Sequence, residues 1–191
     1  MTSIVRGAVG AAALALALAL GGCAASTAEP GPAATPAASV DADDVMFVTM
    51  MIPHHEQAIE MSDTLLAKSG VDERVRDLAQ QIKDAQQPEI TLMQSWLDEW
   101  GVASPGAGHG DMGHGDGMMS DDDVRALEEA DGAEASRLFL EQMIVHHEGA
   151  IAMAQAELTD GSDAQVVELA RAIIDSQTVE IQTMRDLAGQ L

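Results

Sequence analysis

The sequence predicts an all-α fold, a four-helix bundle built from two repeated αα-hairpins. Aromatic residues make up 2% of the chain and Tyr is absent, whereas 12 Met and many Ala and Leu supply the apolar content. This profile favours helices over strands. A segment beginning at Phe47 recurs at Phe139 with a constant offset of 92, and a second match from Leu78 recurs at Leu169 with an offset of 91. Each half therefore has the pattern helix, turn, helix, and two such hairpins bury their apolar faces by packing together.

The periodicity predicts four long helices and one short acidic helix. They cover 41–68, 72–99, 133–158 and 162–189, with the short helix near 121–130. We expect Gly70 and Gly161 to stop the first and third long helices, because Gly commonly follows the last helical turn. Asp72 and Ser162 are expected to cap the starts of the second and fourth long helices.

Two prolines interrupt these helical patterns. Pro53 and Pro88 lie inside the first and second long helices, and the second half continues through the matching positions, Val145 and Thr178 or Val179. Because a matching helix runs on without Pro, we expect kinks rather than helix ends at both prolines.

The N-terminal region has the features of an export signal. Residues 1–22 carry one charge and an apolar run, which predicts a signal peptide, and they end Leu20-Gly-Gly-Cys23. This ending resembles the lipobox of bacterial lipoproteins, so Cys23 is expected to be lipidated. Residues 23–40 are then a Pro/Ala/Ser tether. The expected location is extracytoplasmic, on a membrane lipoprotein anchor; the alternative is a secreted protein with a free thiol.

Charge and composition exclude several function classes. The chain has a formal net charge of −23, and removal of residues 1–22 leaves 8 basic and 32 acidic residues. Such a chain repels phosphate backbones, so nucleic acid is excluded as a partner. The lone Cys cannot form an intrachain disulfide. No nucleophile arrangement, phosphate loop or haem-attachment Cys pair is present, so we expect a binding protein and no enzyme.

Adjacent histidines occur at the same place in both halves, together with methionines on the same apolar helix face. The expected metal ligands on the helices are Met50, Met51, His54, His55, Met61, Met143, His146, His147 and Met153. Thioether with imidazole is the ligand set for Cu(I) or Ag(I), and His-dominated sites also accept Cu(II), Ni(II) or Zn(II). Copper is the leading metal, with Cu(I) favoured and silver second. The alternative is a core of hydrogen-bonded His and gap-filling Met.

A third His pair lies in the linker 101–119 of the bundle domain 41–191. This glycine-rich segment contains Gly-His-Gly-Asp twice, and its expected ligands are His109, Met112, His114, Met118 and Met119. Because glycine gives reach but costs ordering entropy, this metal site should be the weaker one. A solvated hinge between the hairpins is the alternative.

Hairpin geometry brings polar residues of the second helix to the level of the histidines. His54 lies about sixteen residues before Gly70, and Gln86 lies about sixteen residues after it, with Glu89 one turn further. The matching residues in the second half are Gln177 and Glu180. These four side chains are expected to fix the histidine tautomers; the alternative is ordinary polarity of a helix surface.

The histidine motif resembles a known family. Met51-Ile-Pro-His-His-Glu56, with Ala58-Ile59 and Met61, recurs as Met143-Ile-Val-His-His-Glu148, with Ala150-Ile151 and Met153. This is similar to the family called domain of unknown function 305 (DUF305), over about residues 40–190. The resemblance implies a ferritin-like four-helix bundle in an exported copper-binding protein. The halves differ at Pro53/Val145 and Met50/Gln142, so they need not bind metal equally.

Two other function classes stay open. A ferritin-like bundle with di-iron oxidase activity uses Glu three residues before His, but here those positions hold Met51, Ile52, Met143 and Ile144. The sequence therefore argues against di-iron chemistry. The second class is an interaction or scaffold lipoprotein without metal. If the protein binds copper, its expected partners are metal ions, the membrane through the lipid anchor, and copper-handling proteins.

Overall fold

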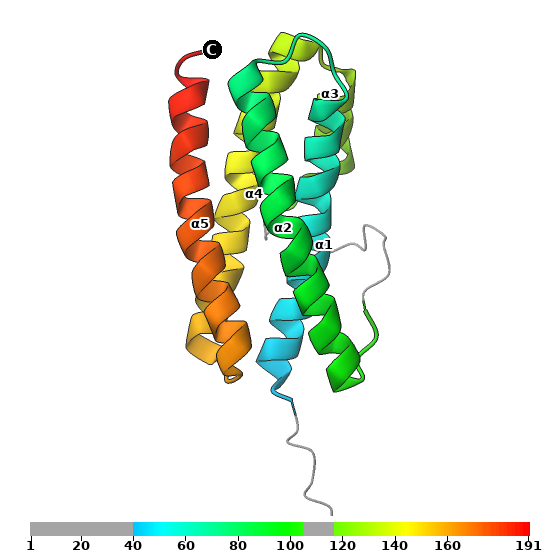
Figure 1. The fold of residues 1–191 in the computed structure, drawn as a ribbon, viewed down its shortest axis with the longest axis vertical. Helices are drawn as coiled ribbons and strands as arrows, with labels where there is room; N and C mark the ends of the chain where they lie inside the picture. The colour runs from blue at the N-terminus through cyan, green and yellow to red at the C-terminus, as the bar shows by residue number, and fades with distance from the viewer. Residues whose placement is uncertain (1–39, 105–116) are drawn as a thin grey trace, which may run out of the picture. The chain divides into compact units, whose positions relative to one another are not determined.

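The computed structural model describes residues 40–104 and 117–191, and all regular structure within them is helical. The helices are α1 (Ala42–Leu66), α2 (Glu73–Trp100), α3 (Asp121–Glu129), α4 (Gly132–Asp160) and α5 (Ala164–Ala188) (Figure 1). No helix in these two ranges is long and apolar enough to cross a membrane. The signal peptide, Cys23 with its tether, and the linker residues His109, Met112 and His114 lie outside the described residues.

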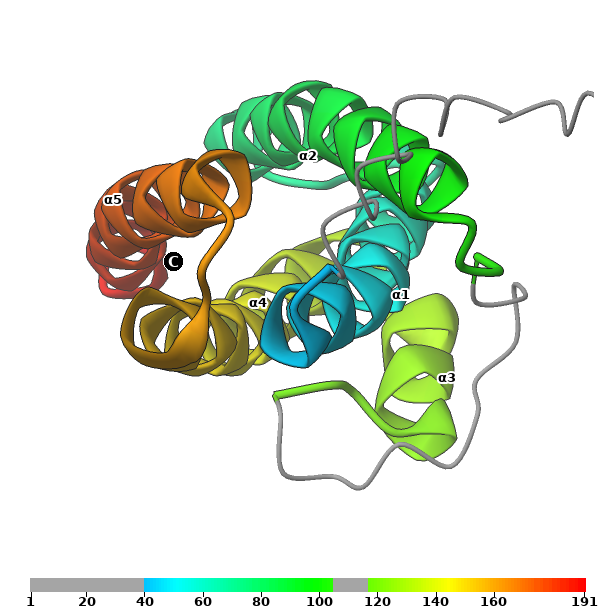
Figure 2. The same ribbon diagram turned by 90° about the horizontal axis from the view of Figure 1, so that it is seen from below.

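The long helices form two antiparallel hairpins, α1 with α2 and α4 with α5, which join through contacts between α1 and α4. Figure 2 shows this arrangement along the helices, with α3 lying against α1 and α4. The prediction of a helical bundle of two hairpins is confirmed. Pro53 and Pro88 lie inside α1 and α2, as expected from the uninterrupted second half.

The helix ends follow the expected chemistry with two corrections. The helix α1 ends at Leu66 with Ala67 as its C-cap, so Gly70 lies in the turn that follows and does not itself stop the helix. Gly70 has φ 76°, a left-handed conformation suited to Gly, and the Asp72 carboxylate accepts a hydrogen bond from the Arg74 amide as predicted for an N-cap. The prediction of Ser162 as the cap of α5 is wrong, because Asp163 caps that helix. The hydroxyl of Ser162 points to acidic residues at the start of α1 instead.

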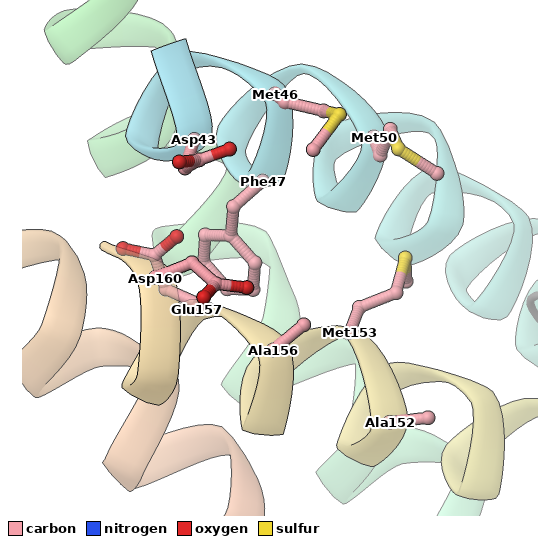
Figure 3. Close-up of a pocket in the computed structure, with 9 residues that line it drawn as sticks. All are labelled: Asp43, Met46, Phe47, Met50, Ala152, Met153, Ala156, Glu157 and Asp160. Atoms are coloured by element: carbon pink, nitrogen blue, oxygen red, sulfur yellow. The ribbon is translucent and has the colours of Figure 1, made fainter. Parts of the chain in front are cut away.

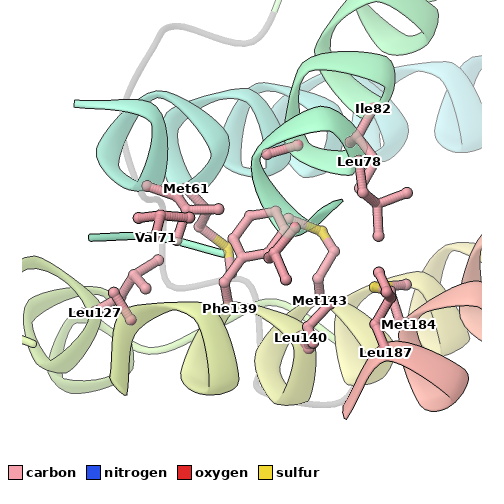
Figure 4. Close-up of a cluster of buried hydrophobic side chains, with 14 of the residues drawn as sticks. Met61, Val71, Leu78, Ile82, Leu127, Phe139, Leu140, Met143, Met184 and Leu187 are labelled. Atoms are coloured by element: carbon pink, nitrogen blue, oxygen red, sulfur yellow. The ribbon is translucent and has the colours of Figure 1, made fainter. Parts of the chain in front are cut away.

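The apolar side chains form two buried clusters on either side of the middle of the bundle. One contains Met61, Leu65, Phe139, Met143 and Met184, most of them shown in Figure 4. The other contains Phe47, Met51, Met93, Trp96 and Ile173. Because each cluster draws residues from both hairpins, neither hairpin buries its apolar face alone.

The short helix α3 is docked on one end of the α1/α4 pair. Its Leu127 is fully buried in the cluster with Met61 and Phe139. Lys68 at the end of α1 donates from Nζ to the carbonyl oxygens of Glu128 and Ala130, so a cation holds the C-terminal end of α3.

Two buried glutamines bind the backbone that leads into α3. The Gln57 side chain donates to the Met119 carbonyl at 2.9 Å and accepts from the Met119 amide at 2.8 Å. The Gln142 side chain donates to the Asp123 carbonyl at 2.8 Å. Since both glutamines are buried, these hydrogen bonds fix the path of the segment across α1 and α4.

A glycine contact lets this segment approach α4 closely. Gly117 has φ 79°, and a Cβ atom added there would lie 2.7 Å from Gly149 Cα and 2.7 Å from the Val145 carbonyl oxygen. Only Gly fits this position on both counts. The second half has Gly149 where the first half has Gln57, so this difference between the repeats serves the docking of the segment.

Candidate metal centre

Four histidines lie at the middle of the bundle, where α1 crosses α4. His54 is 1% exposed, and His55, His146 and His147 are fully buried. The rings of His54 and His146 have centroids 3.8 Å apart with an interplanar angle of 43°. The two His pairs that the sequence places in separate halves therefore form one cluster.

Each hairpin supplies one carboxylate to this cluster. His55 Nε2 lies 2.8 Å from Glu89 Oε2, and His147 Nε2 lies 2.6 Å from Glu180 Oε2. A carboxylate accepts, so Nε2–H donates, and in the neutral ring the lone pair is left on Nδ1. Glu89 and Glu180 thus lie at hydrogen-bond distance from the histidines, and this arrangement presents Nδ1 of both rings as potential ligands.

The two predicted glutamines lie at the same level but do not hold the histidines. Gln86 and Gln177 are each 3% exposed, yet neither polar atom of Gln86 and not Oε1 of Gln177 has a hydrogen-bond partner. The expectation that they fix tautomers is thus wrong, because the adjacent carboxylates take the Nε2–H groups. Both polar atoms of Gln86 and Oε1 of Gln177 therefore remain unsatisfied in the interior.

The centre holds an unusual concentration of unpaired polar atoms. Nδ1 of His55, Nδ1 of His147 and both ring nitrogens of His146 are buried without a hydrogen-bond partner. Burial lowers the pKa of His146 well below its usual range, and the neighbouring histidines lower it further. An uncharged imidazole keeps a lone pair at neutral pH, so His146 has the protonation state that metal binding requires.

The nitrogen and oxygen atoms alone do not make a preformed cage. Among residues 40–104 and 117–191, no group of three or more His, Cys, Asp or Glu side chains is placed to hold one metal ion. Cations such as Cu(I) and Ag(I) bind with few ligands and accept thioethers. The donor chemistry therefore fits a soft monovalent cation better than an ion that needs several hard ligands.

The predicted thioether ligands are distributed over different places. Met61 and Met143 are fully buried in the apolar cluster of Figure 4, and Met51 is fully buried in the other cluster. Met50 and Met153 line a surface pocket between α1 and α4 (Figure 3). The remaining two predicted ligands that the structure describes, Met118 and Met119, precede α3 and are partly buried.

This pocket has a volume of about 380 Å³. Met46, Met50, Met153 and Phe47 line it on the apolar side, and the carboxylates of Asp43, Glu157 and Asp160 gather at its other end (Figure 3). Met46 is 56% exposed, so the pocket is open to solvent.

Sequence reasoning missed one titratable residue of this pocket. Glu157 is 3% exposed, and its carboxyl group lies against the carboxyl group of Asp44. Burial, the adjacent Asp44 carboxyl, and Asp43 and Asp41 raise the pKa of Glu157 to about 8. Asp44 is already engaged by the amides of Ser162 and Asp163 at the start of α5. The repeat contained a signal for Glu157, because a carboxyl group in the second half replaces the apolar Leu65 of the first half.

Comparison with solved structures finds close matches to the whole bundle. A DUF305 fragment from Deinococcus radiodurans is 33% identical with a TM-score of 0.73, covering 80% of this chain and 99% of that chain. A DUF305 protein from Streptomyces coelicolor is 32% identical with a TM-score of 0.71, covering 81% and 94%. CopM in the Cu(II)-bound form is 33% identical with a TM-score of 0.67, covering 77% and 96%.

Sequence comparisons agree with the structural ones. The uncharacterized protein L153 of Acanthamoeba polyphaga mimivirus is 44% identical over 57 residues, which are 30% of this chain and 37% of that protein. The chain thus matches well under half the length of this curated relative. The family model described as "Domain of unknown function (DUF305)" matches residues 44–188, from α1 to the end of α5. The chain is a member of the DUF305 family.

Proposed function

We propose that this protein binds copper, with Cu(I) favoured and with Cu(II) and Ag(I) as further ligands, in copper resistance or homeostasis. One observation carries the proposal. Nδ1 of His55 and Nδ1 of His147 are buried without a hydrogen-bond partner beside the buried His146 ring, although an unpaired buried polar group is costly. A bound metal ion would use the one lone pair that each neutral ring carries.

The solved relatives support the same class of ligand. CopM, at 31–33% identity, has been crystallised in Cu(I)-bound, Cu(II)-bound and Ag-bound forms. This chain has the imidazole and thioether groups that bind such ions. The proposed role is binding without catalysis, because the sequence contains no nucleophile arrangement, phosphate loop or haem-attachment Cys pair.

The proposal divides the ligands by chemistry. An imidazole must lose its proton before it binds a metal ion, whereas a thioether has no proton to lose. Imidazoles would therefore carry Cu(II) binding and its pH dependence. Thioethers, including Met50 and Met153 in the pocket, would carry affinity for Cu(I) and Ag(I), and the linker would add weaker sites.

We further propose that the protein acts outside the cytoplasm on a lipid anchor at Cys23. The lipobox-like ending before Cys23 supports this location, and copper-handling proteins of the same compartment are the expected partners. A Cys23→Ser variant should lack a lipid mass and partition into the aqueous phase of a detergent extraction.

Competition titrations with Cu(I) and Cu(II) at pH 5 and pH 7.5 test the division of ligands. Replacing the four bundle histidines by Ala should remove the pH-sensitive, Cu(II)-competent component. Replacing Met51, Met61, Met143 and Met153 by Leu should spare folding, because Leu is nearly isosteric with Met, and should weaken Cu(I) and Ag(I) binding.

Circular dichroism of both variants controls for loss of helix. If the folded histidine variant keeps its Cu(II) affinity at both pH values, the buried centre is not the site. If the methionine variant holds Cu(I) as tightly as the wild type, the four methionines serve as core packing.

A further inference from the structure

The two ends of the α1/α4 pair are related by the internal repeat. An offset of 92 carries His54 onto His146, and these two rings are in contact at the middle of the pair. Replacing each residue by its repeat partner therefore exchanges α1 with α4 and also exchanges the two ends of their contact. At one end α3 is docked, and at the other end lies the surface pocket of Figure 3.

The pocket corresponds, residue by residue, to the α3-docking surface, which is the part of α1 and α4 against which α3 packs. Around α3, Lys68 and Gln142 donate hydrogen bonds to its backbone. Three further residues belong to the buried cluster that contains Leu127. Their repeat partners all line the pocket. The pairs are Phe139 and Phe47, Met61 and Met153, Leu65 and Glu157, Gln142 and Met50, and Lys68 and Asp160.

The charge of the pocket is opposite to the charge of the α3-docking surface. The cation Lys68, which holds the C-terminal end of α3, is replaced by the acid Asp160, and apolar Leu65 is replaced by Glu157. Glu157 lies almost fully buried in the pocket lining, where its carboxyl group faces the Asp44 carboxyl and, among the described residues, has no cationic partner. A cationic side chain entering the pocket would favour the ionised form of Glu157 and pair with it.

We propose that this pocket is the docking site for a short cationic amphipathic helix of a partner protein. Apolar side chains of that helix lie over Met50 and Met153, as Leu127 of α3 lies among the matching residues at the other end. A Lys or Arg of the helix reaches Glu157 and Asp160. This is the helix-in-groove mode, with charge selecting the partner, and it stands whether or not the chain binds copper.

The mature chain expected after removal of residues 1–22 offers no segment of this chemistry outside the bundle. Residues 23–40 and 105–116 contain no Lys or Arg. The helix α3 of a second copy would bring Asp121, Asp122 and Asp123 toward an acidic pocket, and like charges across an interface disfavour association. The occupant therefore belongs to another protein.

A charge-reversed copy of α3 is the probe that tests the proposal. The peptide has the sequence of residues 119–130 with its five acidic residues replaced by Lys, and it keeps Val124 and Leu127. Added to the metal-free protein carrying ¹³C-labelled Met methyl groups, it should shift the signals of Met46, Met50 and Met153. The signals of Met93 and Met184, which are fully buried elsewhere, should stay unchanged.

Matched variants separate docking from general attraction to an acidic protein. Glu157→Gln with Asp160→Asn should weaken peptide binding at least about tenfold. Asp77→Asn with Glu168→Gln, which removes the same charge at exposed positions of α2 and α5, should leave it unchanged. The peptide with Val124 and Leu127 replaced by Ser should lose the localised shifts.

Three results would overturn the proposal. Equal weakening by both double variants would mean that net charge alone attracts the peptide. Shifts spread over all methionines would place the peptide outside the pocket. Movement of the Met46, Met50 and Met153 signals with protein concentration alone would assign the pocket to a second copy.

Discussion

Cu(I) binding weakens by about 10- to 100-fold, or about 1.4 to 2.8 kcal/mol, when Glu89 and Glu180 are both replaced by Gln. These carboxylates accept the Nε2–H groups of His55 and His147. A carboxylate increases the basicity of the opposite ring nitrogen, and an amide does so less. Because Gln is nearly isosteric with Glu, the helices should remain in place.

The matched control is Glu99→Gln with Glu168→Gln, which removes the same charge from exposed positions of α2 and α5. Affinities are measured by competition with a chromophoric Cu(I) chelator at pH 7.5, with circular dichroism as the folding check. An unchanged affinity in the folded Glu89/Glu180 variant would mean that His55 and His147 do not bind the metal.

Glu157→Gln makes the protein more stable than the wild type at pH 9, by on the order of 2 kcal/mol after allowance for solvent relaxation around the carboxyl. In the folded wild type the pKa of Glu157 is about 8, raised from 4.5. The folded state therefore holds a proton that the unfolded state has lost between these pH values. Its stabilising effect is complete below pH 4.5 and is lost as the pH rises through 8.

Urea unfolding followed by circular dichroism at pH 5.5 and pH 9 measures this effect. The lowered pKa of His146 acts in the opposite direction below pH 6.5, but it is common to both proteins and cancels in their difference. Glu168→Gln, an exposed change on α5, is the control. A difference between Glu157→Gln and wild type that does not change with pH would show that Glu157 is ionised in the folded protein throughout this range.

The internal repeat made much of the fold and part of the site predictable. Two copies of the same motif at offsets of 92 and 91 give two equivalent hairpins, and residue counts from Gly70 place Glu89 at the level of the histidines. That register brings Gln86 with Glu89, and Gln177 with Glu180, near the histidines. It does not say that the carboxylates bind His55 and His147 while the glutamines do not. The bundle is predictable for the same reason, because helix length and turn position determine which residues lie opposite each other.

The partition of the methionines was not predictable from periodicity. Helix angles place Met50 and Met51 on related faces, but the angle does not say which neighbour covers each face. Met51 lies in the core, whereas Met50 faces the pocket, because α3 covers only one end of the α1/α4 pair. Ser162 was likewise misassigned as a cap, since its partner Asp44 comes from a distant part of the sequence.

X-ray absorption at the copper K edge tests the central claim most directly, because it identifies the atoms bound to the metal. The protein is loaded with one equivalent of Cu(I) at pH 7.5, as wild type and as His146→Leu. The account predicts the multiple-scattering pattern of imidazole in the wild type and its reduction in the variant. A spectrum with sulfur scatterers alone, identical in both proteins, would contradict a metal centre at the buried histidines.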